Sequence, residues 1–188
     1  MKRSDLSRRG FTLGALAATS ALAACGNGVG NSNADVLDAR VDATLAQMYR
    51  LYPNTTSLAE KASGMLVMPV VTEAGFGFGG AYGQGALRIQ GATVDYYSLT
   101  EGSWGLQIGA QQYSHVLFFM TDAALTSFRQ SPGWAVGADI KYVISDIGDG
   151  AAANSVTALT PVLAAVFNRG GLYAGAALEG NKYNRIIP

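Results

Sequence analysis

Few side chains in this sequence could carry out catalysis. The 188 residues include a single cysteine, Cys25, and a single histidine, His115. One thiol can neither form a disulfide within the chain nor build a metal site from clustered thiolates. The histidine is followed by the apolar run 116–119, VLFF, and in that setting it is more often a buried structural group than a general base. We therefore expect no catalytic residue, no metal site and no cofactor.

Two glycine-containing segments invite comparison with the motifs of dinucleotide-binding proteins and of hydrolases. Residues 75–80 read GFGFGG and match the G-x-G-x-x-G of a dinucleotide-binding turn. The next residues, AYGQG, contain too much glycine to open the helix that would hold a pyrophosphate, so a glycine-bent strand is the better interpretation. Residues 102–105 read GSWG, which is not the G-x-S-x-G of a nucleophile elbow. An envelope hydrolase that uses Ser103 or Ser114 with His115 is kept only as a distant alternative.

The overall composition excludes several further function classes. Thirteen basic residues balance thirteen acidic residues, and 49% of all residues are apolar while 14% are charged. This balance is incompatible with a disordered chain and with a nucleic-acid binder that relies on a strong basic field. The length predicts one domain, and 24 glycines against 5 prolines indicate a turn-rich or sheet-rich fold rather than a helical bundle.

The N-terminal segment has the features of an export signal. An apolar run from Phe11 to Ala24 follows four basic residues, Lys2, Arg3, Arg8 and Arg9. The run is too short to span a bilayer, which needs about 20 apolar residues. The segment 7–13, SRRGFTL, resembles a twin-arginine export signal. We expect residues 1–24 to be a signal peptide, with the twin-arginine and the general export routes both open.

Cys25 follows the residues LAA at 22–24, which resemble the lipobox of bacterial lipoproteins. In such a site the thiol receives a diacylglyceryl group, and two or three acyl chains anchor a protein durably. We expect Cys25 to be lipidated and residues 25–34 to form a flexible polar tether. Gly26, where an aspartate would retain a Gram-negative lipoprotein, favours the outer membrane, facing the periplasm or the surface. An ordinary cleaved signal that ends near a cysteine is the alternative.

Three helices are predicted from apolar periodicity and end signals. The first runs from Asp35 to Tyr52 and ends before Pro53. A second, short helix begins with a capping box formed by Ser57 and Glu60 and closes at Gly64. The third spans 122–130, with Thr121 or Asp122 as its N-cap.

The remaining pattern predicts a sheet. Strand-like segments lie at 65–71, 75–89, 94–99, 104–111, 115–120, 134–143, 156–167 and 172–178. The first of them reads as a strand covered on both faces, with Pro69 at an edge or a bulge. The segment 156–167 could also be helical. We predict an α+β domain over residues 35–188, with a mostly antiparallel, strongly curved, glycine-rich sheet and a few helices packed on one side.

Several blocks together resemble the SYLF family of lipid-binding domains. The resemblance spans about residues 35–188 and rests on GMLVMP at 64–69, GFG at 75–77, GALR at 85–88, YY at 96–97, SWGLQIGAQ at 103–111, FMT at 119–121, GWAVG at 133–137 and LEGNK at 178–182. It implies binding to membrane lipid, with phosphoinositides as ligands and actin regulation as a role among eukaryotic members. The family has no catalytic apparatus attached to it. For an exported bacterial protein, phospholipid or the lipid part of an envelope glycolipid is the more sensible ligand.

The resemblance and the tether suggest a lipid-binding face. The apolar face of the first helix would either pack on the sheet or swing out to admit a lipid; its residues are Leu37, Val41, Leu45 and Met48. Headgroup phosphate would need donors, and the candidates nearest the expected edges are Lys61, Arg88, Arg129, Lys182 and Arg185. We expect a non-enzymatic lipoprotein concerned with membrane organisation or lipid homeostasis, with no nucleic-acid partner. The rival is a protein-docking or structural module whose lipid is only its anchor, with an unknown protein partner.

Overall fold

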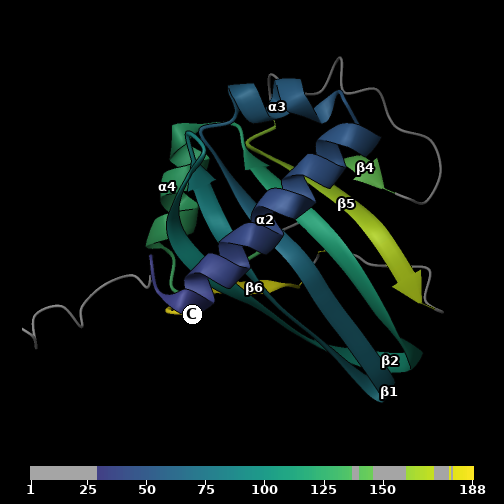
Figure 1. The fold of residues 1–188 in the computed structure, drawn as a ribbon. Helices are drawn as coiled ribbons and strands as arrows, with labels where there is room; N and C mark the ends of the chain where they lie inside the picture. Colours follow the sequence, from purple (N-terminus) through teal and green to yellow (C-terminus); the bar gives the residue numbers. More distant parts are fainter. Residues whose placement is uncertain (1–28, 137–139, 146–159, 172–177, 179) are drawn as a thin grey trace, which may run out of the picture.

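The computed structural model describes residues 29–136, 140–145, 160–171, 178 and 180–188. In chain order these form α2 (Ser32–Leu51), α3 (Thr55–Lys61), β1 (Gly64–Ile89), β2 (Ala92–Phe119), α4 (Asp122–Gln130), β3 (Trp134–Ala135), β4 (Lys141–Ser145), β5 (Val162–Gly171) and β6 (Lys182–Ile186) (Figure 1). The expected signal peptide, Cys25 and the greater part of the expected strand 172–178 lie outside the described residues.

A long hairpin organises the sheet. β1 and β2 pair antiparallel from Gly64 opposite Phe119 to Ile89 opposite Ala92. Gln90 and Gly91 connect them with φ values of 51° and 82°, the positive values that a two-residue type I′ turn requires. On its other edge β2 pairs with β6 and β5, β3 adds to β6, and β4 runs parallel to β5. The predicted α+β fold with a mostly antiparallel, curved sheet is confirmed.

The strands are longer and fewer than the sequence pattern suggested. The segments 94–99, 104–111 and 115–120 belong to one strand, β2, because their glycines bend the ladder without ending it. The ambiguous segment 156–167 enters β5 at Val162, while residues 156–159 lie outside the described residues. β6 was not predicted, since its sequence KYNRI is short and mostly polar.

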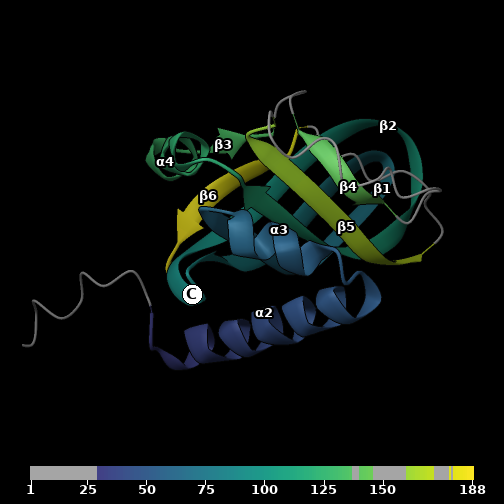
Figure 2. The same cartoon turned by 90° about the horizontal axis from the view of Figure 1, so that it is seen from above.

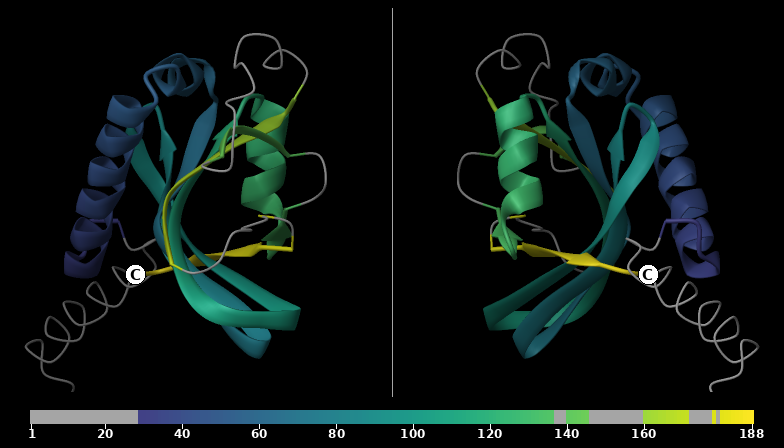
Figure 3. Two further views of the ribbon diagram at one scale, coloured as in Figure 1. Left: turned by 90° about the vertical axis from the view of Figure 1, so that its right-hand side faces the viewer. Right: turned by 90° about the vertical axis from the view of Figure 1, so that its left-hand side faces the viewer.

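Helices cover both faces of the sheet, so the expectation that they pack on one side is wrong. α2 and α3 lie on the convex face, whereas α4 lies inside the curl (Figure 2, Figure 3). Leu66 and Met68 pack toward α4, and Val67 between them packs toward α2. An apolar run that points to both faces must be covered on both, because successive side chains of a strand alternate between them.

The helix ends follow local capping, with one exception. α2 begins three residues before the predicted start because the side chain of Asn31 accepts a hydrogen bond from the amide of Ala34 at 2.8 Å. α4 has the predicted bounds and Thr121 as its N-cap. The predicted capping box of Ser57 is wrong, since its hydroxyl donates to the carbonyl of Asn54 inside a helix that starts at Thr55.

The β1–β2 ribbon doubles back on itself, and glycine makes this possible. A Cβ on Gly83 would lie 2.9 Å from the carbonyl oxygen of Val70, and a Cβ on Gly85 would overlap the carbonyl of Val67. Only glycine permits two stretches of backbone to approach so closely. We name the part between them, residues 72–82 of β1 and 100–112 of β2, the ribbon bend. It reaches away from α3 toward the lower right of Figure 1.

Candidate functional site

The apolar face of α2 packs on the sheet. Leu37, Val41 and Met48 are buried against the convex face, together with Tyr96 and Phe118. Leu45 is partly buried in the same cluster. Of the two arrangements expected for this helix, the structure has the one in which it packs on the sheet. An outward movement of α2 that admits a lipid stays a prediction.

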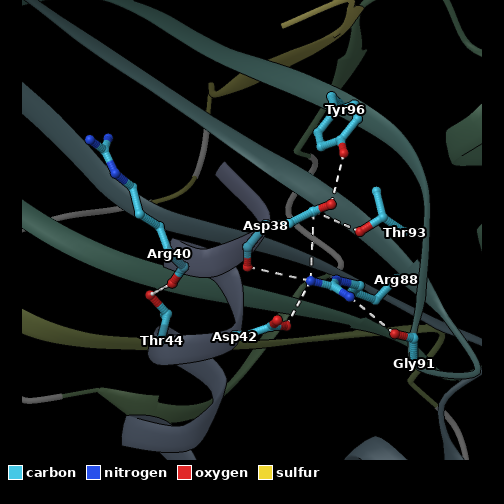
Figure 4. A network of polar contacts seen from close by, with 8 residues as sticks. All are labelled: Asp38, Arg40, Asp42, Thr44, Arg88, Gly91, Thr93 and Tyr96. Atoms are coloured by element: carbon cyan, nitrogen blue, oxygen red, sulfur yellow. Dashed lines mark hydrogen bonds and ion pairs between the residues drawn. The ribbon is translucent and has the colours of Figure 1, made fainter. Parts of the chain in front are cut away.

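Arg88 joins the hairpin to α2 (Figure 4). Its guanidinium lies 2.7 Å from the carboxylate of Asp42 and 3.6 Å from that of Asp38. Asp38 also accepts hydrogen bonds from Thr93 at 2.7 Å and from the phenol of Tyr96 at 2.9 Å. Burial, helped by this carboxylate, raises the pKa of Tyr96 to about 12. The arrangement neutralises Arg88 and fixes the helix, so this cation is engaged within the domain.

Two more of the candidate cations converge on one buried carboxylate. Asp95, whose side chain is 4% exposed, lies 3.1 Å from Arg129 and 3.3 Å from Arg185. These arginines come from α4 and β6, and the aspartate comes from β2. The ion-paired group links three elements, and the side chains of Arg129 and Arg185 are 41% and 49% exposed. Each arginine thus retains an outer edge that water, or a ligand, can reach.

Lys61 and Lys182 are exposed, and none of the ion pairs among the described residues involves them. Arg40 is a third exposed cation of this kind, and the sequence did not single it out because three aspartates are its neighbours along the chain. In the structure its side chain points away from Asp38 and Asp42 (Figure 4). The signal that could have found it is its spacing of four from Val36 and three from Ala43, which places it on a different flank of the helix from the acids.

Two pockets meet at Arg40. One of about 330 Å³ lies between α2 and the start of the ribbon bend and contains Val70 and Gln47. The other, of about 360 Å³, lies near the start of α2 and contains Val36 and Gln84. Among the described lining residues of both pockets, Arg40 carries the one charged side chain. The combination of a cation with uncharged and partly apolar walls suits an anionic group that carries an apolar part.

The groups considered for hydrolysis do not form a catalytic pair. The hydroxyl of Ser114 donates to the carbonyl of Pro69 at 2.7 Å rather than to His115. The imidazole is fully buried, and its Nε2 is hydrogen-bonded to the phenol of Tyr183 at 2.8 Å. Burial lowers the pKa of His115 to about 3. The expected role as a core group agrees with this geometry, while the side chain of Ser103 lies outside the described part of the structure.

The described part of the chain contains no group of three or more His, Cys, Asp or Glu side chains that could hold a metal ion. No helix within it has both the length and the apolar character needed to cross a membrane.

A family model described as "Ysc84: Las17-binding protein actin regulator" matches residues 100–185 of this chain. The matched region runs from the ribbon bend through β2, α4 and β5 to β6. It therefore includes both arginines that bind Asp95 and the residue pair His115 and Tyr183. A comparison with curated proteins found no match.

Proposed function

Starting from a chain whose residues 100–185 belong to the Ysc84 (SYLF) family, we propose a lipid-binding lipoprotein of the bacterial cell envelope. The family is associated with lipid binding and actin regulation, and it is a family of binding domains rather than of enzymes. The family match is the observation that carries the proposal. Its ligand here is a phospholipid or a related envelope lipid, and its role is in membrane organisation or lipid homeostasis.

The N-terminal sequence supports the anchor. The basic residues, the apolar run and the small residues ahead of Cys25 agree in position with a lipoprotein signal. Acylation at this cysteine would hold the domain beside the bilayer through two or three chains. The protein then resides in the envelope, on the outer membrane, facing the periplasm or the surface.

The geometry supports binding rather than turnover. The one histidine is buried and its neighbouring serine is bonded to backbone. Two pockets offer a cation on uncharged walls, which is a setting for an anionic amphiphile. An exported bacterial protein would not meet actin. Of the two functions associated with the family, lipid binding is therefore the one proposed for this chain.

A flotation experiment tests the proposal. Every described helix, strand and buried side chain lies within residues 29–188, so a chain of residues 26–188 retains the buried side chains on both faces of the sheet without the anchor. We expect this chain to float with vesicles of phosphatidylethanolamine and phosphatidylglycerol. Native mass spectrometry of the same purified chain identifies any lipid that it carries.

Metabolic labelling with palmitate tests the anchor separately. The full chain should incorporate labelled palmitate, and the Cys25→Ser variant should not. If the full chain is labelled but residues 26–188 neither float nor carry lipid, the domain is a docking module whose lipid is only its anchor.

A further inference from the structure

Exposed apolar side chains gather on one side of the domain. Among the described residues, seven large hydrophobic side chains are exposed, and five of them lie along the outer face of β1 or beside the N-terminal part of α2. These five are Val36, Val70, Phe78, Tyr82 and Ile187. Phe78 and Tyr82 are 65% and 54% exposed. Exposed apolar groups concentrated in one patch mark an interaction surface, whereas scattered single ones do not.

Strand alternation puts the β1 members on one face. Val70, Phe78 and Tyr82 are all even-numbered, and the bulge at Pro69 turns the even positions of this stretch outward. Residues directly opposite in an antiparallel pair share a face. Tyr82 is opposite Thr100, and Thr100 is opposite Lys182. The exposed Lys182 therefore stands in the same cross-strand row as Tyr82.

The pockets connect this strand face to α2. The first brings Val70 together with Arg40, and the second brings Gln84 together with Val36 and Ile187. Because Arg40 lines both, the outer face of the ribbon and the flank of the helix form one surface. We name it the outer apolar face: Val36, Arg40, Val70, Phe78, Tyr82, Lys182 and Ile187.

The acidic groups nearby point elsewhere. Glu73 is buried and accepts a hydrogen bond from Gln111 at 2.7 Å. Glu101 is opposite Ala81, which packs toward the concave face. Burial and the charge of Glu73 both raise the pKa of Glu101, as expected for two carboxyl groups on that same side. On α2, Asp38 and Asp42 are turned toward Arg88. The outer apolar face thus presents cations without described acidic side chains among them.

We infer that the outer apolar face docks on the interface of a phospholipid bilayer, an inference that rests on the proposed lipid-binding function. Phe78, Val70 and Val36 would enter the acyl boundary, and Tyr82 would lie at headgroup level, as aromatic rings with a polar end do. Arg40 and Lys182 would pair with lipid phosphates while their stems cover apolar surface.

The position of the anchor agrees with this orientation. The first described residue, Val29, lies three residues before the first residue of α2, Ser32, and is itself exposed. Val29 is the fourth residue after Cys25, and an extended chain spans at most about 3.5 Å per residue, so acylation would hold this end within about 14 Å of the bilayer. The ends of the outer apolar face at Val36 and Ile187 are next to that point.

A single fluorescent label gives the decisive measurement. Residues 26–188 contain no cysteine, so Phe78→Cys and Ser127→Cys each provide one attachment site for a polarity-sensitive dye. Both positions are exposed, and Ser127 lies on α4 inside the curl. On addition of vesicles of phosphatidylethanolamine and phosphatidylglycerol, we expect a blue shift of the dye at position 78 and none at position 127.

Charge reversals provide a matched second arm. Lys182→Glu and Arg40→Glu should each weaken binding to these vesicles by about fivefold or more, since a basic group near an anionic surface contributes on the order of that factor. Lys61→Glu is the control, because Lys61 is also exposed but lies on α3, away from the ribbon bend. It should change binding less than about twofold.

Each contrary outcome identifies what has failed. If unlabelled residues 26–188 float but the dye at position 78 does not shift, or shifts no more than at 127, the docking face is wrong and lipid binding stands. If the chain does not float at all, the proposed lipid binding fails and the inference fails with it. A shift at position 78 that grows with protein concentration without vesicles would assign the face to a second copy of the chain and overturn the bilayer proposal.

Discussion

The two halves of the β1–β2 ribbon share one hydrogen-bonded ladder but meet different surroundings. Near its open end, Leu66 and Val67 of β1 and Phe118 of β2 are fully buried, because helices cover both faces there. At the ribbon bend the same strand exposes Phe78 and Tyr82. Both parts are continuously paired with β2.

This difference separates backbone pairing from side-chain burial. A strand needs its hydrogen bonds in either place, whereas its stability comes mainly from the apolar area that packing removes from water. Side chains at the open end should therefore determine folding, and those at the bend should be replaceable without loss of the fold.

Phe118→Ala should lower the free energy of unfolding by about 3–5 kcal/mol, because the ring is fully buried between α2 and the sheet. Urea denaturation of residues 26–188 followed by circular dichroism measures it. A loss of less than about 1 kcal/mol would mean that the open end of the ribbon is not a close-packed core.

His115 should make stability depend on pH. Its pKa is about 3 when folded, against 6.5 for the exposed group, so below pH 6.5 the unfolded chain binds a proton that the folded chain does not. Stability from this residue is complete above pH 6.5 and is lost as the pH falls toward 3, with a slope of about 1.4 kcal/mol per pH unit. Urea titrations between pH 7 and 4.5 give the slope of the free energy of unfolding against pH for the wild type and for His115→Gln. The difference between the two slopes separates the contribution of His115 from that of the carboxylates. Equal slopes would contradict the buried neutral imidazole.

Asp95→Ala should destabilise the domain by about 1–2 kcal/mol. The carboxylate is buried, but Arg129 and Arg185 are exposed enough to be rehydrated when it is removed. Asp42→Ala is the matched control, since its side chain is 66% exposed and Arg88 retains Asp38; its effect should stay below about 0.5–1 kcal/mol. Thermal denaturation of the two variants compares them, and equal losses would mean that the burial of Asp95 adds nothing.

Phe78→Ala should change the free energy of unfolding by less than about 0.5 kcal/mol, although it removes the same group as Phe118→Ala. Its ring is mostly in solvent, so truncation leaves no cavity. Vesicle flotation should nevertheless decrease. A destabilisation close to that of Phe118→Ala would erase the distinction between the two halves of the ribbon.

The ion pairs join residues that are far apart in the sequence, so they could not be predicted from it. Arg88 and Asp42 are 46 residues apart in sequence, and Arg129 and Asp95 are 34 apart. Nothing within a few residues of either arginine indicates its partner. On sequence alone, we therefore predicted the same role, that of headgroup donor, for these arginines and for Lys61 and Lys182. Arg40 was passed over because of its acidic neighbours, whose carboxylates the helix directs to another flank.

The sequence by itself determined the class of the molecule and its local elements. Apolar periodicity, the N-cap of α4 and the proline after α2 act within one or two helical turns, so they can be read without a fold. The family blocks indicated a binding domain, and the scarcity of reactive groups argued against catalysis. Only the tertiary structure decided which face each helix covers, which cations are neutralised and which apolar residues stay exposed. These features depend on the close backbone approach that glycine permits where the β1–β2 ribbon doubles back. This approach brings together residues that no local sequence pattern connects.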